Sequence, residues 1–358
     1  MQPGIDFVVK RNDLHSARFV AGEPVRSDLQ AGHVQLRVEK FALTANNVTY
    51  AVYGDAIGYW GYFPTLEEGW GRPPAWGFGE VVASGNPEIE VGQRFYGFYP
   101  ISSLVTMEAK AHPAGFKDVA IHRQSLPKAY NQYTITSRDP VYDMEHEDEQ
   151  MILRPLFVTS FLAADFIQEK ELLGAESIVI SSASSKTAYG MAFLLSQMGA
   201  EVIGLTSRKN HGFTESLGCY DRVVSYEDVA SLPTERKVAY VDVAGSVPLR
   251  KQLAERLGVN LVYSMALGDT HWNQDKDGGL LTQDQTFFFA PEWLAKRIGD
   301  WGMDGYLGRL ADSWKVFSPS LGGWMKVVTE SGQEEVERIW RQHLDGAADP
   351  AVGNVLSL

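Results

Sequence analysis

The chain has 358 residues, of which 44% are hydrophobic, so it is long enough to form two domains with cores of their own. Its formal net charge of −13 argues against a general nucleic-acid or anionic-membrane surface, but not against a local basic pocket for a phosphate. The single cysteine, Cys219, excludes an internal disulfide and a structural zinc site made of several cysteines, so we expect no metal centre.

The ends and the apolar segments of the sequence give no sign of membrane insertion. No apolar run reaches the ~18 residues of a spanning helix, and the start MQPGIDFVVKRND lacks the apolar core of a secretory signal. We therefore expect a soluble, cytoplasmic protein with neither a membrane nor a nucleic acid as its partner.

The first 110 or so residues have the pattern of short strands separated by glycine- and proline-containing turns. Residues 33–43 show the clearest alternation, with Val34, Leu36 and Val38 against polar neighbours, which is typical of a half-buried strand. Further strands are predicted at 7–9, 79–84 and 92–100. This half is predicted to be β-rich and barrel-like.

Two loop-like stretches follow from composition. Residues 46–64 carry five aromatic residues before Phe63, with glycines between them, and suit either a pocket wall or a packed surface loop. Residues 126–140 are predicted to be a solvated loop. The acidic run 143–149 precedes a helical segment, where it complements the helix dipole without needing a metal or a partner.

Residues 177–210 have the pattern of one βαβ unit. A β-branched run at 178–180 leads through a small-residue bend, 181–187, into an apolar series at helical spacing. The helix is expected to stop at Gly199, and a second strand begins at Val202.

The bend of this unit is a candidate anion site, because free N–H groups and the helix dipole meet there in parallel sheets. Ser184, Ser185, Lys186 and Thr187 supply hydroxyl groups and a positive charge. Past the second strand, at the place of a dinucleotide's ribose, stand Ser207, Arg208 and Lys209. Two cations at this position favour a 2′-phosphate, so the predicted cofactor is NADPH. The alternative is an ordinary βαβ unit whose serines only cap a helix, since the usual glycine-rich pattern is missing.

The later sequence continues to alternate strands and helices, which predicts a doubly wound parallel sheet. Strands are expected at 223–226, 237–245 and 259–268, and the last strand, near the C-terminus, is expected to pair with the β-rich first half. Asp242 and His271 each follow near a strand end and could face the cofactor, although an exposed turn is the commoner setting for such a histidine.

Several segments together resemble the zinc-free medium-chain dehydrogenases/reductases, close to their quinone oxidoreductase and enoyl reductase branches. The segments are KFALTANNVTY (40–50), WGFGEVVASGNPEIEVGQRFYGF (76–98), LGCYDRVVSY (217–226), YVDVAGS (240–246) and GNVLSL (353–358). The resemblance covers nearly the whole chain. It departs from the family at the bend, ASSKTA, and at Thr49, where the family has an aspartate.

The resemblance implies an α/β fold with a GroES-like catalytic domain, residues 1–150 and 316–358, and an inserted Rossmann domain, residues 151–315. It also implies a nicotinamide cleft and a homodimer. The family's substrate-assisting tyrosine corresponds to Tyr50, with Tyr53 as second choice, and Asn47 would help to orient the acceptor oxygen.

The resulting hypothesis is an NADPH-dependent, zinc-independent reductase acting on a quinone, an enone or another α,β-unsaturated carbonyl compound. The aromatic residues of 46–64 favour an apolar or aromatic small-molecule substrate. The alternatives are a ketone or aldehyde reductase, and a non-catalytic NADPH-binding sensor or structural protein.

Overall fold

The computed structural model describes residues 3–56, 58–267 and 285–358, and its chain forms two compact units. One unit is Met1–Ile152 with Lys326–Leu358, and the other is Leu153–Met325. The second boundary falls at Lys326 rather than at 316, because the preceding helix reaches Phe317, whose ring packs on Phe157 and Tyr189 of its own unit. His271 lies outside the described residues.

A closed antiparallel barrel forms the centre of the first unit. Its six strands pair in the order β3 (His33–Leu43), β5 (Pro74–Ser84), β6 (Arg94–Pro100), β9 (Gln132–Ile135), β8 (Gly115–Asp118) and β7 (Leu104–His112). Strand β7 pairs with β3 and so closes the ring. The last strand, β17 (Val352–Ser357), pairs with β3 on one side and with β16 (Lys326–Ser331) on the other. The predicted pairing of the C-terminal strand with the first half is confirmed.

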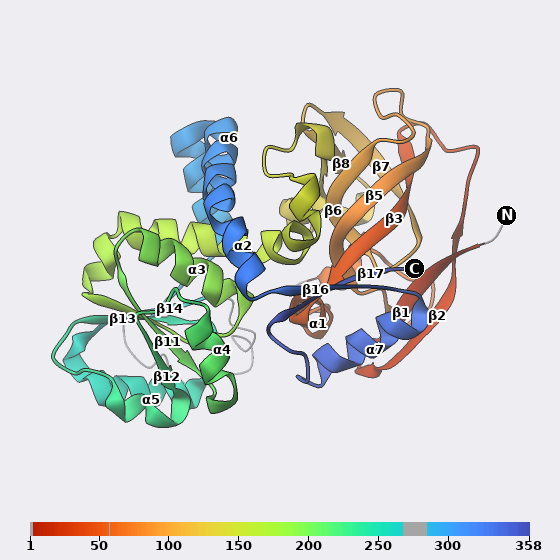
Figure 1. The fold of residues 1–358 in the computed structure, drawn as a ribbon. Coiled ribbons are helices and arrows are strands. Elements are labelled where there is room, and N and C mark those ends of the chain that lie inside the picture. Colours follow the sequence, from red (N-terminus) through yellow and green to blue (C-terminus); the bar gives the residue numbers. More distant parts are fainter. Residues whose placement is uncertain (1–2, 57, 268–284) are drawn as a thin grey trace. The chain divides into compact units, whose positions relative to one another are not determined.

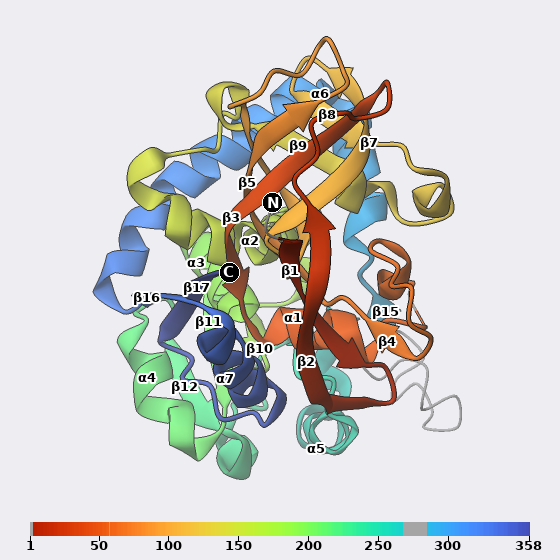
Figure 2. The same cartoon turned by 90° about the vertical axis from the view of Figure 1, so that its right-hand side faces the viewer.

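A second, three-stranded sheet covers one side of this unit. Strand β1 (Pro3–Lys10) lies between β2 (Asp13–Pro24) and β4 (Trp70–Gly71), and α7 (Gln333–Leu344) packs against β2 (Figure 2). The indole of Trp340 on α7 is fully buried and donates to the Leu14 carbonyl at 3.0 Å. The sequence pattern did not predict strand β2, because its residues are half-buried or exposed and do not alternate between apolar and polar.

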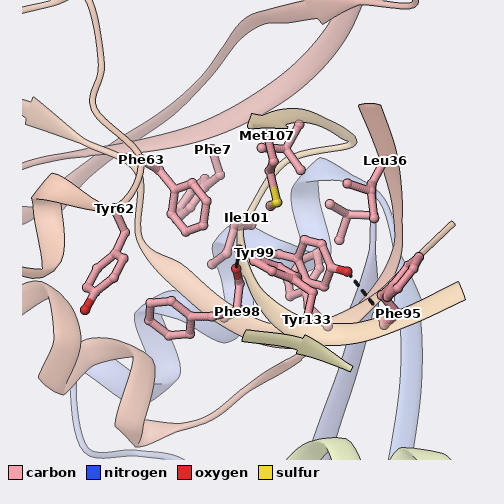
Figure 3. Packing of buried hydrophobic residues seen from close by; sticks show 14 of the residues in the cluster. Phe7, Leu36, Tyr62, Phe63, Phe95, Phe98, Tyr99, Ile101, Met107 and Tyr133 are labelled. Atoms are coloured by element: carbon pink, nitrogen blue, oxygen red, sulfur yellow. Dashed lines mark hydrogen bonds between the residues drawn. The ribbon is translucent and has the colours of Figure 1, made fainter. Parts of the chain in front are cut away.

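Aromatic side chains dominate the barrel core (Figure 3). The predicted solvated loop at 126–140 is wrong, because Tyr133 is fully buried and Asn131 is only 8% exposed. The Tyr133 ring stacks on Phe116 with centroids 4.7 Å apart, and its hydroxyl donates to the Phe98 carbonyl. Despite its polar residues, this stretch therefore forms a strand and a 3-10 helix that contribute to the core.

The second unit has a six-stranded sheet in which every pairing is parallel. The strand order is β12 (Arg222–Ser225), β11 (Glu201–Thr206), β10 (Ser177–Ile180), β13 (Val238–Asp242), β14 (Leu261–Ala266) and β15 (Gln285–Phe287). Helices α3 (Lys186–Gln197) and α5 (Val247–Leu257) lie on opposite faces of the sheet (Figure 1). The predicted doubly wound Rossmann sheet is confirmed, and its order reverses between β10 and β13.

The remaining α-helices are α1 (Ala45–Val52), α2 (Glu147–Glu169), α4 (His211–Ser216) and α6 (Ala290–Phe317). Short 3-10 helices are η1 (Tyr59–Gly61), η2 (Ile121–Arg123), η3 (Lys128–Asn131), η4 (Thr136–Arg138), η5 (Met144–His146), η6 (Glu171–Gly174), η7 (Arg208–Asn210), η8 (Tyr226–Ser231), η9 (Gly258–Asn260) and η10 (Ser318–Gly323).

Among the described residues, one helical stretch, Met144–Glu169, is long and apolar enough to cross a membrane. Most of its apolar window is buried inside the structure, and Phe157 packs against Trp314 and Phe317. These contacts identify it as a core helix.

The acidic residues before α2 enter a cluster of ion pairs. Glu147 lies 2.6 Å from Arg94 Nη1 and 2.5 Å from Lys40 Nζ, and Arg94 also contacts Glu39. Burial by itself would raise the pKa of Glu147, but hydrogen bonds from Arg94, Lys40 and Tyr142 outweigh it and lower the pKa to about 2. The acidic run thus ties the start of α2 to the barrel, besides complementing the helix dipole.

We expect this cluster to make the stability of the protein sensitive to acid. Because the folded-state pKa of Glu147 lies below the ordinary value of 4.5, its stabilisation is complete above that pH and is lost as the pH falls towards 2. Glu147→Gln should therefore lower the free energy of unfolding by roughly 1 to 2 kcal/mol at pH 7 after allowance for solvent screening. Urea unfolding at several pH values between 2 and 7 measures this, and a constant difference between the two proteins across that range would contradict it.

Candidate functional site

Three side chains from neighbouring strand ends hold the bend between β10 and α3. The Ser182 N–H donates to the Tyr226 hydroxyl at 2.9 Å, and the Tyr220 hydroxyl donates to the Ala183 carbonyl at 2.8 Å. Asn210 Nδ2 donates to Ser184 Oγ at 3.1 Å. Three consecutive residues of the bend are therefore fixed from outside it.

Ser182 occupies the left-handed backbone region, with φ of 52°. Such a conformation costs a residue with a Cβ roughly 1 to 2 kcal/mol and is normally given to glycine. The hydrogen bond to Tyr226, together with the Ser185 N–H bond to the Ser182 carbonyl at 2.8 Å, holds the conformation. This is how the chain forms the bend without the glycines that the sequence lacks.

The predicted phosphate-site residues have distinct positions at the start of α3. Ser185 is the N-cap, and its Oγ accepts the Ala188 N–H at 3.3 Å, so capping is this serine's own structural role. Lys186 is the first helical residue, and the Thr187 carbonyl accepts from Ser160 Oγ. Within the described part of the chain, the backbone N–H groups of Ser184 and Thr187 have no partner. They remain available to an anion.

The basic segment after β11 lies beside this bend, because Asn210 follows Lys209 and bonds to Ser184. Ser207 precedes η7, and the side chains of Arg208 and Lys209 are exposed. Arg208 Nη2 is 3.7 Å from Asp228 Oδ2, and 70% of the Arg208 side chain is exposed. Asn210 is the N-cap residue of α4, yet its side chain does not cap that helix and reaches the bend instead.

Asp242 has a different role from the predicted contact with a cofactor. It is 1% exposed, and its Oδ1 accepts from Ser181 Oγ, the Tyr240 hydroxyl and the Gly245 N–H at 2.9 to 3.0 Å. Its Oδ2 lies 2.9 Å from Arg250 Nε. The carboxylate therefore joins the ends of β10 and β13 from inside the fold.

A cavity of about 330 Å³ opens next to the bend, at the carboxyl ends of β12 and β13. It is lined by Tyr226, Glu227, Ala244, Ser246, Pro248, Leu249 and Gln252. Tyr226 lines the cavity, and its hydroxyl accepts from the Ser182 N–H of the bend. This edge of a doubly wound sheet is where such folds bind nucleotides.

The first unit contains a cluster of aromatic rings around Tyr50. Thr44 caps α1, and the helix places Asn46 and Tyr50 one turn apart. The Tyr50 hydroxyl accepts from Asn46 Nδ2 at 2.7 Å and from Trp76 Nε1 at 3.0 Å. The Tyr50 ring lies 4.7 Å from the Tyr59 ring and 6.1 Å from the Tyr130 ring, centroid to centroid. The Tyr59 and Tyr130 hydroxyls are 3.0 Å apart.

The other two predicted catalytic residues differ from Tyr50. Asn47 is buried. Its Oδ1 accepts from the Thr44 N–H at 2.7 Å, and its Nδ2 donates to the Pro74 carbonyl at 2.9 Å. Both ends of its amide are used inside the fold, so Asn47 completes the cap of α1 rather than orienting an acceptor oxygen. Tyr53 is the C-cap residue of α1. The neighbouring Asn46, not Asn47, is the asparagine that contacts Tyr50.

The tyrosines of this cluster are hydrogen-bond donors at neutral pH. Burial raises the pKa of Tyr50, Tyr59 and Tyr130 well above the ordinary phenol value, and neighbouring tyrosines add to the effect. In Tyr50 the bonds from Trp76 and Asn46 act in the opposite direction but do not overcome burial. A cluster of protonated phenols in an apolar setting can stabilise negative charge on a bound oxygen.

Within residues 3–56, 58–267 and 285–358, no three His, Cys, Asp or Glu side chains are placed to hold a metal ion. Cys219 is buried, and burial raises the pKa of its thiol to about 12.

A family model described as "Protein of unknown function (DUF2855)" matches residues 41–349 of the sequence. The chain belongs to this family. A search of curated protein sequences found no significant match.

Solved structures place the DUF2855 chain in a wider fold group. It is similar to CurA of Vibrio vulnificus in complex with NADPH (13% identity, 98% of each chain covered, TM-score 0.62). It is also similar to the quinone oxidoreductase of Coxiella burnetii (12%, 99% of each chain, 0.56) and to the yhdH oxidoreductase of Salmonella enterica in complex with NADP (15%, 99% of each chain, 0.55). The DUF2855 chain therefore has the medium-chain dehydrogenase/reductase fold, a GroES-like barrel with a Rossmann unit, as its sequence motifs indicated.

Sequence reasoning missed several residues that the structure brings to these two sites. In the DUF2855 chain they are Asn46, Trp76, Tyr130, Asn210, Tyr220 and Tyr226. Asn46 and Tyr50 are separated by four residues on a helix, so their contact could have been inferred from spacing. The others contact their partners through strand order, which no local pattern shows.

The strained bend gives a test of stability in the DUF2855 protein. Ser182→Gly should raise the free energy of unfolding by up to about 1 kcal/mol, because glycine adopts positive φ without the Cβ penalty. Ser184→Gly is the matched control, since Ser184 does not have a positive φ and loses its bond to Asn210. Ser184→Gly should lower the free energy of unfolding. Urea unfolding of both variants measures this, and destabilisation of equal size in both would show that the backbone at Ser182 is not strained.

Proposed function

We propose that this protein is an NADPH-dependent oxidoreductase that reduces a quinone, an enone or another α,β-unsaturated carbonyl compound by hydride transfer without zinc. The observation that carries the proposal is the Asn210–Ser184 hydrogen bond, which holds the basic segment 207–209 beside the bend at the start of α3. A phosphate-binding bend and cations for a second phosphate are then neighbours in one unit.

The residues present fit the phosphates of NADPH. The N–H groups of Ser184 and Thr187 and the Ser184 hydroxyl are donors at a helix N-terminus, where the dipole favours an anion. Lys186 adds a positive charge at the same end of α3. Arg208 and Lys209 are exposed beyond β11, where an NADPH 2′-phosphate would need them. The cavity beside Tyr226 offers an apolar wall for the adenosine part.

The substrate side of the proposal rests on the Tyr50 cluster. When bound, NADPH supplies the hydride. The chain's own contribution is to donate hydrogen bonds to the acceptor oxygen as negative charge develops on it, and Tyr50 is the residue that we assign to this role. The surrounding rings of Tyr59, Tyr130 and Phe98 favour a flat, apolar substrate. We also propose that the protein acts in the cytoplasm as a homodimer.

The first test is turnover. Purified protein with NADPH and a panel of quinones, enones, ketones and aldehydes should oxidise the cofactor with the quinones or enones, followed by absorbance at about 340 nm. Tyr50→Phe should lower kcat/KM about 100-fold, the range for loss of one oxyanion donor. Tyr62→Phe is the control, because the Tyr62 hydroxyl is already bound to the Pro127 carbonyl at 2.8 Å.

The panel also separates the alternatives. Turnover of ketones or aldehydes alone would indicate a carbonyl reductase. Tight NADPH binding with no turnover of any compound would indicate a sensor or a structural protein, and equal rates for the wild type and Tyr50→Phe would remove Tyr50 from the mechanism.

The second test is cofactor preference. Arg208→Ala should weaken NADPH binding by about 1 to 3 kcal/mol, the range for a charge-assisted hydrogen bond, and leave NADH binding unchanged. Fluorescence titration with each cofactor measures this. Arg236→Ala is the matched control, because Arg236 is also exposed and paired with a surface carboxylate, Glu201, but lies away from the bend. An equal loss for both cofactors in Arg208→Ala would contradict a contact with the 2′-phosphate.

A further inference from the structure

The hydrogen bonds of Tyr50 have a fixed direction. A phenol oxygen has two acceptor positions and one proton. Asn46 Nδ2 and Trp76 Nε1 are donor groups, and they lie 2.7 Å and 3.0 Å from this oxygen. Both acceptor positions of Tyr50 are therefore used, so the phenol can act only as a donor, and the Tyr130 hydroxyl interacts with it in the absence of a substrate.

The indole of Trp76 is held firmly enough to impose this direction. Trp76 lies on β5 between the buried residues Ala75 and Gly77. Its ring stacks on Tyr96 with centroids 5.5 Å apart and an interplanar angle of 17°, and it contacts Phe98 at 5.2 Å. An indole N–H is a donor only, so it cannot exchange roles with the phenol as another hydroxyl could.

The neighbouring hydroxyls of Tyr59 and Tyr130 lie 3.0 Å apart and share one hydrogen bond, in which either can donate. Because Asn46 and Trp76 fill the acceptor positions of Tyr50, this phenol is complementary to an oxygen that accepts, such as a carbonyl or quinone oxygen.

We propose that Trp76 is a positioning residue for Tyr50: together with Asn46 it occupies the acceptor positions of the phenol and so directs the Tyr50 proton to the substrate oxygen. This inference rests on the proposed reductase function and adds to it the residue that sets the polarity of the site. Two N–H donors on the phenol oxygen also strengthen its donation, because hydrogen bonds in a chain polarise one another. Charge that develops on the substrate oxygen is then met by an already oriented donor.

The competing explanation is structural, since a half-buried indole needs a partner and Tyr50 provides one. The two explanations differ in what Trp76→Phe does. Phenylalanine keeps a ring against Tyr96 and Phe98 but removes the N–H group. A positioning role predicts a lower kcat with little change in KM or in NADPH affinity, whereas a structural role predicts a lower Tm and no selective effect on kcat.

The experiment is a double-mutant cycle of Trp76→Phe and Tyr50→Phe, with the quinone or enone that the wild type reduces best. We expect about a 10-fold lower kcat for Trp76→Phe in the wild-type background and no further loss when Tyr50 is already Phe. Asn46→Asp tests the same direction from the other donor: its carboxylate accepts the Tyr50 proton, so kcat should fall at least as far as in Trp76→Phe.

Trp340→Phe is the matched control, because that indole also loses one hydrogen bond in the same unit, to the Leu14 carbonyl. It should change Tm and leave kcat unchanged. An unchanged kcat in Trp76→Phe, or the same fold-loss in both Tyr50 backgrounds, overturns the positioning role while the reductase function stands. A wild-type protein without activity on the panel overturns the function and this inference together.

Discussion

The second unit depends on one backbone constraint, the reversal from β10 into α3 without glycine at its tightest residue. Ser182 adopts a left-handed conformation that its Cβ disfavours. The chain sustains it through side chains from adjacent strand ends, with Tyr226 on Ser182, Tyr220 on Ala183 and Asn210 on Ser184. These contacts come from residues after β11 and before and after β12, so the bend depends on strands that the parallel sheet brings next to it. The geometry of the bend therefore depends on the order of the strands in the sheet.

The same constraint explains the arrangement of polar groups around the bend. Asp242, which would be exposed at a strand end in a looser fold, is buried and receives hydrogen bonds from Ser181, Tyr240 and Gly245. It joins β10 to β13 at the reversal of strand order, the place where doubly wound sheets open towards a ligand. Asn210 bonds to the bend instead of capping α4, which would be the usual use of an asparagine at that position. The start of α4 therefore lacks a side-chain capping bond, because Asn210 bonds to Ser184 of the bend.

In the first unit the corresponding organising feature is a core with many aromatic rings. Arg123 and Asp118 form an ion pair in the interior at 3.0 Å, with the guanidinium 4.5 Å from the Phe63 ring centroid. This pair fixes the 118–133 segment against the aromatic stretch that contains Tyr59, Tyr62 and Phe63. Removing one partner of such a pair leaves an uncompensated buried charge, so the two segments are held together strongly. Tyr130 and Tyr59 come into contact as a consequence, and the loop that composition suggested to be solvated becomes part of the core.

The sequence by itself predicted a β-rich first half, the βαβ unit, a doubly wound parallel sheet and the pairing of the C-terminal strand with the first half, and its family resemblance implied the GroES-like and Rossmann domains. The strands and helices follow from periodic burial, which is a local property of the sequence. It also singled out Tyr50 and the hydroxyl-lined bend. The sequence did not show that Asn46, and not Asn47, contacts Tyr50, because adjacent polar residues look alike until the direction of each side chain is known. For the same reason the sequence suggested that Asp242 contacts the cofactor, whereas its side chain points into the fold. Only the tertiary structure decided which of them are used inside the fold and which remain open. The physical reason is that a buried polar group must find a partner, and that partner, such as Trp76 for Tyr50 or Tyr226 for Ser182, comes from a strand far away in the sequence.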